Sequence, residues 1–376
     1  MLNNQSVYFP NLDGIRFFAA LMVMVHHVEQ LRAGFGLTNH WDNEIIKSLG
    51  MLGVILFFVL SGFLISFLFF NELKQTQTIS IKKFYTRRII RIWPLYFFII
   101  LISLFILPNL SFMYYPGAAV LDMDTKMYKV LPLYILFLPN LVVVAINSIP
   151  FCSQSWSIGV EEQFYLIWPI LNKFIKNKLM IAFVVIFLYL LLKFMILLKI
   201  IGNGQNSLLF QFWESMPIHF MAIGSLLAYV AFFETKFTQC LKRILYNPAI
   251  QLMVFTAIVI CLGFDLKLRY FNLEMYALLF GIVILNAASG TSNIFKMNNP
   301  VLKYLGKISY GLYMYHFICI VFVLQLLIKL ELSNNIFLVY ISIITCTVLI
   351  SGISYSTIER YFLKYKSKYA IVISGE

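Results

Sequence analysis

An arginine and a histidine share one face of the first apolar segment, which reads LDGIRFFAALMVMVHHV over residues 12–28. Arg16 and His27 are eleven residues apart. That is close to three helical turns, so both project from one side, separated by roughly 16 Å along the axis. His26 points about 80° away from Arg16. A guanidinium binds anionic groups and an imidazole can act as a general base, so the segment predicts a ligand held at Arg16 that reacts near His27. The alternatives are a topological anchor for Arg16 and a hydrogen-bonded interior histidine for His27.

Two adjacent acids lie early in another apolar segment, SWSIGVEEQFYLIWP, residues 155–169. Ionisable groups inside a membrane are costly, which makes each of them a functional candidate. We expect Glu161 and Glu162 to lie at about the depth of His27. A carboxylate beside an imidazole orients it and raises its basicity. Glu161 and Glu162 are therefore predicted to be catalytic together with His27.

Aromatic residues and a second histidine are candidates for binding the substrate. Trp156 and Tyr165 could form a rim on which a sugar ring stacks, although membrane interfaces are rich in Trp and Tyr for anchoring alone. His316 lies within LGKISYGLYMYHF, residues 305–317, and could line the same cavity. The alternative for His316 is an interior histidine with a structural hydrogen bond.

A basic run and a small-residue notch are candidates for binding a phosphorylated ligand. Arg87, Arg88 and Arg91 lie in RRIIR, and guanidinium groups suit bidentate phosphate contacts. Ser61 lies beside Gly62 in GVILFFVLSGFLIS, where small side chains let a helix or a ligand approach closely. The arginines also serve as cytoplasmic topology signals, and the notch also serves helix packing. No metal-binding pattern, nucleophile elbow or P-loop is present.

The composition requires a membrane to position these residues. Of 376 residues, 61% are hydrophobic and only 12% are charged, against about 25% charged in soluble domains. The net charge of +13 comes from basic residues between apolar runs, which indicates topology and contact with lipid headgroups, and not nucleic-acid binding. We therefore predict an all-α polytopic membrane protein. Candidate spans lie near 12–31, 47–70, 89–107, 131–146, 158–174, 178–199, 212–233, 248–264, 270–289, 307–329 and 336–359.

One of these eleven candidates must fail to cross if every basic loop is cytoplasmic. The segment 131–146 is the weakest, because Pro132, Pro139 and Asn140 interrupt it. We predict a re-entrant or partial segment there, about ten spans in a single domain over 1–376, and both termini in the cytoplasm. A short basic tail is expected from about residue 360.

Five motifs together resemble the acyltransferase-three family of membrane acyltransferases. They are LDGIR…HH, GVILFFVLSGFLI, RRIIRIWPLY, SWSIGVEEQFYLIWP and LGKISYGLYMYH, and they extend over about residues 8–360. The resemblance implies about ten helices in a bacterial inner membrane. It also implies transfer of an acyl group, usually acetyl, from coenzyme A on the cytoplasmic side to a glycan hydroxyl. Acetyl-coenzyme A is then a co-substrate, and no permanently bound cofactor or metal is expected. Many members have a polar residue where this chain has Ile55.

The predicted mechanism follows from these residues. Arginines hold the donor phosphates, and His27, oriented by Glu161 or Glu162, deprotonates a carbohydrate hydroxyl that attacks the acyl carbon. A transient acyl-histidine is an alternative route. The rival functions are a transporter or flippase for a glycan or small solute, and a sensor that binds acyl-coenzyme A without turnover. The acceptor, the acyl group and the oligomeric state are left open by the sequence.

Overall fold

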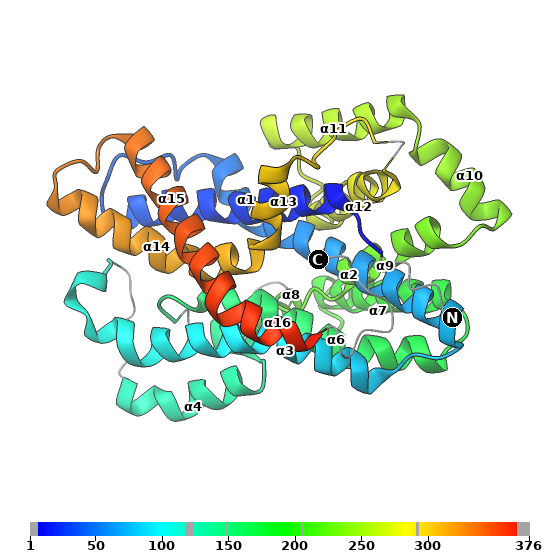
Figure 1. The fold of residues 1–376 in the computed structure, drawn as a ribbon, viewed down its shortest axis with the longest axis horizontal. Coiled ribbons are helices and arrows are strands. Elements are labelled where there is room, and N and C mark those ends of the chain that lie inside the picture. Colours follow the sequence, from blue (N-terminus) through cyan, green and yellow to red (C-terminus); the bar gives the residue numbers. More distant parts are fainter. Residues whose placement is uncertain are drawn as a thin grey trace.

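The computed structural model describes residues 7–116, 123–146, 149–202, 204, 207–290 and 293–366, and their regular structure is helical (Figure 1). The helices are α1 (Pro10–Gly34), α2 (Glu44–Thr76), α3 (Ile81–Leu101), η1 (Ile102–Ile106), η2 (Leu107–Asn109), η3 (Ser111–Met113), α4 (Met123–Ile135), α5 (Pro139–Ala145), η4 (Ser153–Ser155), α6 (Trp156–Phe174), α7 (Lys178–Leu197), α8 (Leu208–Glu214), α9 (His219–Phe232), α10 (Lys236–Leu245), α11 (Pro248–Gly263), α12 (Asn272–Ser289), α13 (Pro300–Lys307), α14 (Ser309–Lys329), α15 (Ile336–Ser354), η6 (Tyr355–Glu359) and α16 (Arg360–Lys366).

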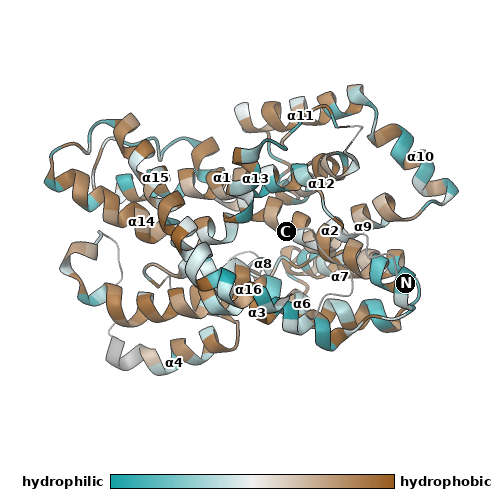
Figure 2. Cartoon of the chain, viewed as in Figure 1, coloured by the Kyte–Doolittle hydropathy of each residue, from teal (hydrophilic) through white to brown (hydrophobic). Residues whose placement is uncertain are grey.

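Many of these helices can cross a membrane. Among the described residues, seven helical stretches are long and apolar enough, and the bent pair α10–α11 makes an eighth if it counts as one span. α1 and α6 fall outside this count although they have 25 and 19 residues, and they carry three of the charged candidates, Arg16, Glu161 and Glu162. Figure 2 shows hydrophobic residues along α3, α14 and α15 and hydrophilic ones gathered at α10 and α16. The chain is an integral membrane protein, as its composition predicted.

The segment 131–146 does not form one continuous helix. α4 ends at Ile135, Phe137 has a positive φ of 56°, and α5 begins at Pro139. A proline at the first position of a helix is favourable, whereas an internal proline costs a hydrogen bond. Gln163 of α6 donates to the carbonyl of Phe137 at 3.0 Å and to Asn140 Oδ1 at 2.9 Å. Polar groups of this irregular segment are thus hydrogen-bonded to another helix of the protein. A membrane protein tolerates irregular backbone where it is buried in this way.

α2 is the central helix of the bundle and packs along α1 on one side and α9 on another. Two glycines make the contact with α9 close. A Cβ on Gly62 would lie 1.9 Å from the carbonyl oxygen of Met221, and one on Gly224 would lie 2.0 Å from that of Val59. The small residue at 62 therefore serves helix packing, which leaves Ser61 beside it free to face another direction. Ile55 is fully buried in the same core.

A further glycine contact brings α13 against the start of α1. A Cβ on Gly306 would lie 2.2 Å from the carbonyl oxygen of Asp13, so only glycine permits this approach. Asn11 reinforces it, because its amide oxygen accepts from Met297 N at 2.9 Å. The basic end of α13 is therefore placed next to Arg16. At the other end of the chain, α16 packs on α3 (Figure 1), and the rest of the predicted basic tail, residues 367–376, lies outside the described residues.

Candidate functional site

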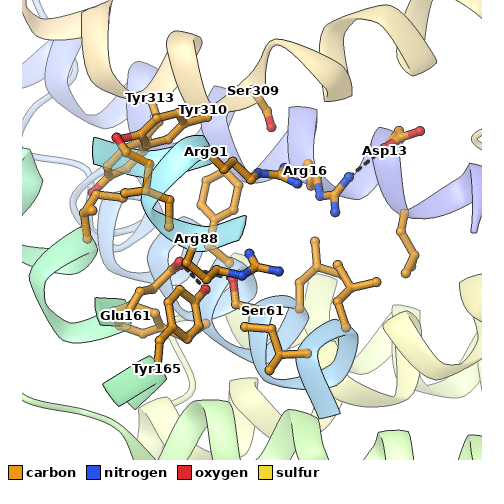
Figure 3. Close-up of a pocket in the computed structure, with 18 of the residues that line it drawn as sticks. Asp13, Arg16, Ser61, Arg88, Arg91, Glu161, Tyr165, Ser309, Tyr310 and Tyr313 are labelled. Carbon is orange, nitrogen blue, oxygen red and sulfur yellow. Dashed lines mark hydrogen bonds and ion pairs between the residues drawn. The ribbon is translucent and has the colours of Figure 1, made fainter. Parts of the chain in front are cut away.

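A cavity of about 150 Å³ opens between α1, α2, α3, α6 and α14. Figure 3 shows Arg16, Arg88 and Arg91 projecting into the same space from two different helices. The polar side chains that line it, tyrosines included, are Tyr8, Asp13, Arg16, Ser61, Arg88, Arg91, Ser157, Glu161, Tyr165, Ser309, Tyr310 and Tyr313. We call the part of the cavity that Arg16, Arg88 and Arg91 line the arginine end, and the part that Tyr313 lines the Tyr313 end.

Two of the three cavity arginines, Arg16 and Arg88, contact neighbouring side chains. Arg16 donates to Asp13 at 2.8 Å, and the Tyr8 hydroxyl donates to the same carboxylate at 2.8 Å. Burial and this contact with Asp13 raise the pKa of Tyr8 to about 12, so its phenol stays neutral. The Arg88 guanidinium lies 5.3 Å from the ring centre of Tyr165. Arg88 Nε is buried and, among the described residues, has no hydrogen-bond partner, so this end of the cavity suits an anion.

Arg87, predicted with its neighbours to bind phosphate, lies elsewhere. Its guanidinium faces Glu72 of α2 at 3.8 Å and does not line the cavity. The cause is helical geometry, since adjacent residues on a helix point about 100° apart while residues three apart share a face. Arg88 and Arg91 thus point into the cavity and Arg87 ties α3 to α2.

Glu161 lies in the cavity, but on the arginine side. Its carboxylate accepts from Ser61 Oγ at 3.1 Å and from the Tyr165 hydroxyl at 2.6 Å. Glu162 accepts from the indole of Trp93 at 3.2 Å. The structure therefore unites Ser61, Glu161 and Tyr165 with the arginines, and it places neither acid against His27.

His27 instead pairs with His316. His27 Nδ1 lies 3.1 Å from His316 Nε2 and 2.9 Å from the carbonyl oxygen of Val23. The other nitrogen of His316, Nδ1, lies 2.6 Å from the carbonyl oxygen of Tyr313. Phe317 packs edge-on against the His27 ring, with centroids 5.6 Å apart. Two sequence candidates of different predicted roles therefore form one unit.

The depth of the acids explains why the expected contact with His27 is missing. Ser157 and Tyr313 are hydrogen-bonded at 2.7 Å, which sets α6 and α14 side by side at one level. From that level His316 is three residues onward on α14, whereas Glu161 is four residues onward on α6. Because the chain enters the bundle at opposite ends of the two helices, the levels of His316 and Glu161 differ by roughly 10 Å.

The contacts of the pair determine where its protons lie. A carbonyl oxygen only accepts, so neutral His316 must carry its proton on Nδ1, which faces Tyr313, and its Nε2 is then an acceptor. His27 Nδ1 faces that acceptor and the Val23 carbonyl, so it must carry the proton. The lone pair of neutral His27 is consequently on Nε2, the atom that a general base would use.

The predicted aromatic rim is not formed. Tyr165 lines the arginine end of the cavity, and Trp156 packs edge-on against Phe58, with centroids 6.1 Å apart, without lining the cavity. His316 is buried against His27 and does not face an open surface. The ring next to the histidine pair on the cavity side is Tyr313, whose centroid lies 5.8 Å from that of His316.

A second cavity of about 250 Å³ adjoins the arginine end. It shares Tyr8, Asp13, Arg16, Arg91 and Tyr310 with the first cavity. It adds one leucine, Leu363, and four polar residues from α13 and η6, namely Lys303, Lys307, Tyr355 and Glu359. The two cavities therefore form a continuous series of lining residues, which begins at the surface lysines Lys303 and Lys307 and ends at Tyr313.

The sequence interpretation did not identify several lining residues as functional. Ser157 and Tyr313 stand inside recognised motifs, and their polarity within apolar segments was the available signal. Lys303 and Lys307 belong to the basic residues between apolar runs, which the sequence indicates only as topology signals. Their i, i+4 spacing places them on one face of α13, but the partner face on α1 is set by packing at Gly306.

Comparisons with known proteins identify the family of the chain. A family model described as an acyltransferase domain matches residues 9–356. The O-acetyltransferase OatA of Staphylococcus aureus strain NCTC 8325 / PS 47 is 28% identical over 372 residues, covering 94% of this chain and 57% of OatA. A candidate O-acetyltransferase of S. aureus strain COL is 26% identical over 380 residues, covering 95% of this chain and 58% of that protein.

The chain thus spans little more than half the length of the curated relatives it matches. No solved structure matches it. The family model, however, covers most of the chain, including every lining residue of the first cavity except Val7 and Tyr8. The chain therefore belongs to the acyltransferase-three family of membrane acyltransferases.

Proposed function

We propose that this chain transfers an acyl group from acyl-coenzyme A to a hydroxyl of a cell-surface or exported carbohydrate, and that the acyl group is acetyl. The observation that carries the proposal is a cavity that runs from three arginines to Tyr313, one helical turn from the His27–His316 pair. The names of the relatives support oxygen as the accepting atom.

The arginine end holds the donor by its phosphates. Arg88 and Arg91 face the cavity from α3, and Arg16 faces it from α1 (Figure 3). Charge-assisted contacts between guanidinium and phosphate are among the stronger hydrogen bonds in proteins. The remainder of the donor lies along the apolar walls, which include Val54, Phe57 and Phe58, with its thioester toward Tyr313.

The reaction takes place at His27. His27 Nε2 accepts the proton of the carbohydrate hydroxyl as its oxygen attacks the acyl carbon. The new carbon–oxygen bond forms, the carbon–sulfur bond breaks, and the proton passes from His27 to the departing thiolate. His316 orients His27 and accepts from Nδ1–H, which stabilises the imidazolium. Transfer should therefore decline as pH falls, because a protonated His27 has no lone pair to offer.

The membrane placement follows from the donor. Acyl-coenzyme A is a cytoplasmic metabolite, so the arginine end faces the cytoplasm and the acceptor reaches His27 from the opposite side of a bacterial cytoplasmic membrane. Both chain ends then lie in the cytoplasm, in line with the basic loops.

The test is acyl transfer by membranes that contain this chain and acetyl-coenzyme A labelled in the acetyl group. We expect label in the carbohydrate fraction, together with release of an equal amount of free coenzyme A thiol. Carbohydrate movement across the membrane with no thiol release would instead establish a transporter. Donor binding without release would establish a sensor.

A further inference from the structure

The second cavity has a composition that the acyl-transfer step does not explain. Lys303 and Lys307 extend from α13 with exposed side chains, so the cavity is open to the surface. The Lys303 ammonium lies 5.1 Å from the ring centre of Tyr8, and that of Lys307 lies 5.2 Å from the ring centre of Tyr355. Each cation is thus steered by an aromatic face toward the cavity that both rings line.

The charge of this cavity is positive. Four basic residues line it, whereas its acids are Asp13 and Glu359. Asp13 is already engaged by Arg16 and by the Tyr8 hydroxyl, each at 2.8 Å. Two lysines four residues apart on one helix face can contact neighbouring phosphates of one ligand. The cavity therefore suits a group with more than one phosphate.

Glu359 indicates a second chemical group that a ligand of this cavity should carry. It is 7% exposed and lines the cavity from η6. Among the described residues, its Oε1 is buried and has no hydrogen-bond partner. A buried carboxylate oxygen without a partner is costly, so a ligand that offers an N–H donor would satisfy it. The combined chemistry is phosphate plus an amino group.

We propose that the second cavity binds the phosphorylated adenosine end of the acyl donor, with Lys303 and Lys307 on its phosphates and Glu359 accepting from the amino group of the base. This inference rests on the proposed function, because one donor would then occupy both cavities through the shared residues Arg16 and Arg91. The site makes the enzyme select nucleotide-linked donors over acyl groups carried on phosphopantetheine alone.

A lipid with an ethanolamine headgroup offers the same pair of groups, a phosphate and an amine. The excess of basic residues over the two adjoining cavities favours the nucleotide, because an ethanolamine lipid carries only one phosphate. The experiment distinguishes the two sources by placing the full chain in lipid nanodiscs of phosphatidylcholine alone, or of phosphatidylcholine mixed with phosphatidylethanolamine.

The probes are adenosine 3′,5′-bisphosphate and inorganic pyrophosphate, titrated calorimetrically. We expect the bisphosphate to bind in both lipid mixtures and to bind at least tenfold more weakly to the K303Q/K307Q double variant. The K236Q/K329Q variant, which removes two lysines outside both cavities, should bind as the wild type does. E359L should weaken binding of the bisphosphate and leave pyrophosphate binding unchanged or stronger, because it removes a negative charge.

Three results would overturn the proposal. They are no bisphosphate binding in phosphatidylcholine, equal binding by K303Q/K307Q and K236Q/K329Q, and loss of binding when phosphatidylethanolamine is present, which would assign the cavity to lipid. The KM for acetyl-coenzyme A separates this inference from the proposed function. Acetyl transfer with an unchanged KM in K303Q/K307Q would refute the second site and leave the acyltransferase intact. Bisphosphate binding by a wild type that transfers nothing would do the reverse.

Discussion

Two groups of charged side chains lie between the helices of the bundle or at its edge, and they differ in how far the protein itself balances their charge. In the first, Lys193 of α7 contacts Glu274 at 2.9 Å and Glu214 at 3.3 Å. His219 lies 3.4 Å from Glu274 and stacks on Tyr189, with ring centroids 3.7 Å apart. We call these four charged or ionisable residues, Lys193, Glu214, His219 and Glu274, the lysine cluster.

The second group lines the two cavities. Five basic residues and three acidic ones face these cavities from the described part of the chain. The lysine cluster links α7, α8, α9 and α12, and its cation is matched by carboxylates. The cavities carry an excess of positive charge. A buried ion in a membrane is a functional candidate by default. We infer from this comparison that charge balance separates a structural cluster from a candidate ligand site.

The largest effect on stability should come from the lysine cluster. Lys193→Met leaves Glu274 buried without its cation, which should lower the free energy of unfolding by about 3–5 kcal/mol. The KM for acetyl-coenzyme A should not change. Lys267→Met, at an exposed lysine that pairs with Asp265 and Glu44, is the control and should leave the free energy of unfolding close to the wild-type value. A K193M protein with normal stability and weakened donor binding would show that the lysine cluster is part of the donor-binding site.

The histidine pair should show the next largest effect, on turnover. His316→Leu removes the acceptor for His27 Nδ1–H, and we expect kcat to fall roughly 10²-fold or more, as when a catalytic histidine loses the group that sets its tautomer. His316→Gln keeps a carbonyl acceptor and should retain more activity than His316→Leu. The KM for the donor should be the same in both variants. A loss confined to KM would make His316 a binding residue, as its place in the sequence first indicated.

Neighbouring arginines on α3 provide the sharpest contrast within the second group. Arg88→Gln should raise the KM for acetyl-coenzyme A by about 10- to 100-fold, the worth of one charged hydrogen bond. Arg87→Gln should leave KM near the wild-type value, because its guanidinium faces Glu72. Steady-state kinetics of the two variants would measure this contrast. A raised KM in R87Q with an unchanged KM in R88Q would mean that Arg87, and not Arg88, faces the cavity.

The smallest effect is expected at Ser61. Its hydroxyl donates to Glu161 at 3.1 Å, and Ser61→Ala removes only that bond. Side-chain hydrogen bonds in membrane proteins average about 0.6 kcal/mol, so activity should fall no more than about threefold. Gly62→Ala, by contrast, should impair folding, because a Cβ there meets the backbone of Met221. A large kinetic loss in a well-folded S61A protein would mean that Ser61 contacts the substrate itself.

The sequence predicted the helices well because hydropathy and proline are local signals. Arg16 and His27 lie on α1, and the break in 131–146 falls between Ile135 and Pro139. Local signals in the sequence could not predict which side chains of other helices contact Arg16 and His27. Position along a helix gives an approximate depth, but it gives neither rotation nor the neighbouring helix. Glu161 was therefore assigned to His27, whereas the packing of α1 on α14 brings His316 there.

The most direct test compares two adjacent histidines. His26 contacts Trp41 and the carbonyl oxygen of Ile46 and packs edge-on against His27, with ring centroids 4.9 Å apart, but among the described residues it hydrogen-bonds to neither His27 nor His316. His27, by contrast, carries the lone pair on Nε2. Transfer of labelled acetyl from acetyl-coenzyme A to membrane carbohydrate would be measured for His27→Gln and His26→Gln, each at matched protein levels. We predict a loss of roughly 10²- to 10⁴-fold for His27→Gln and near wild-type transfer for His26→Gln. Equal transfer by both variants would contradict this prediction.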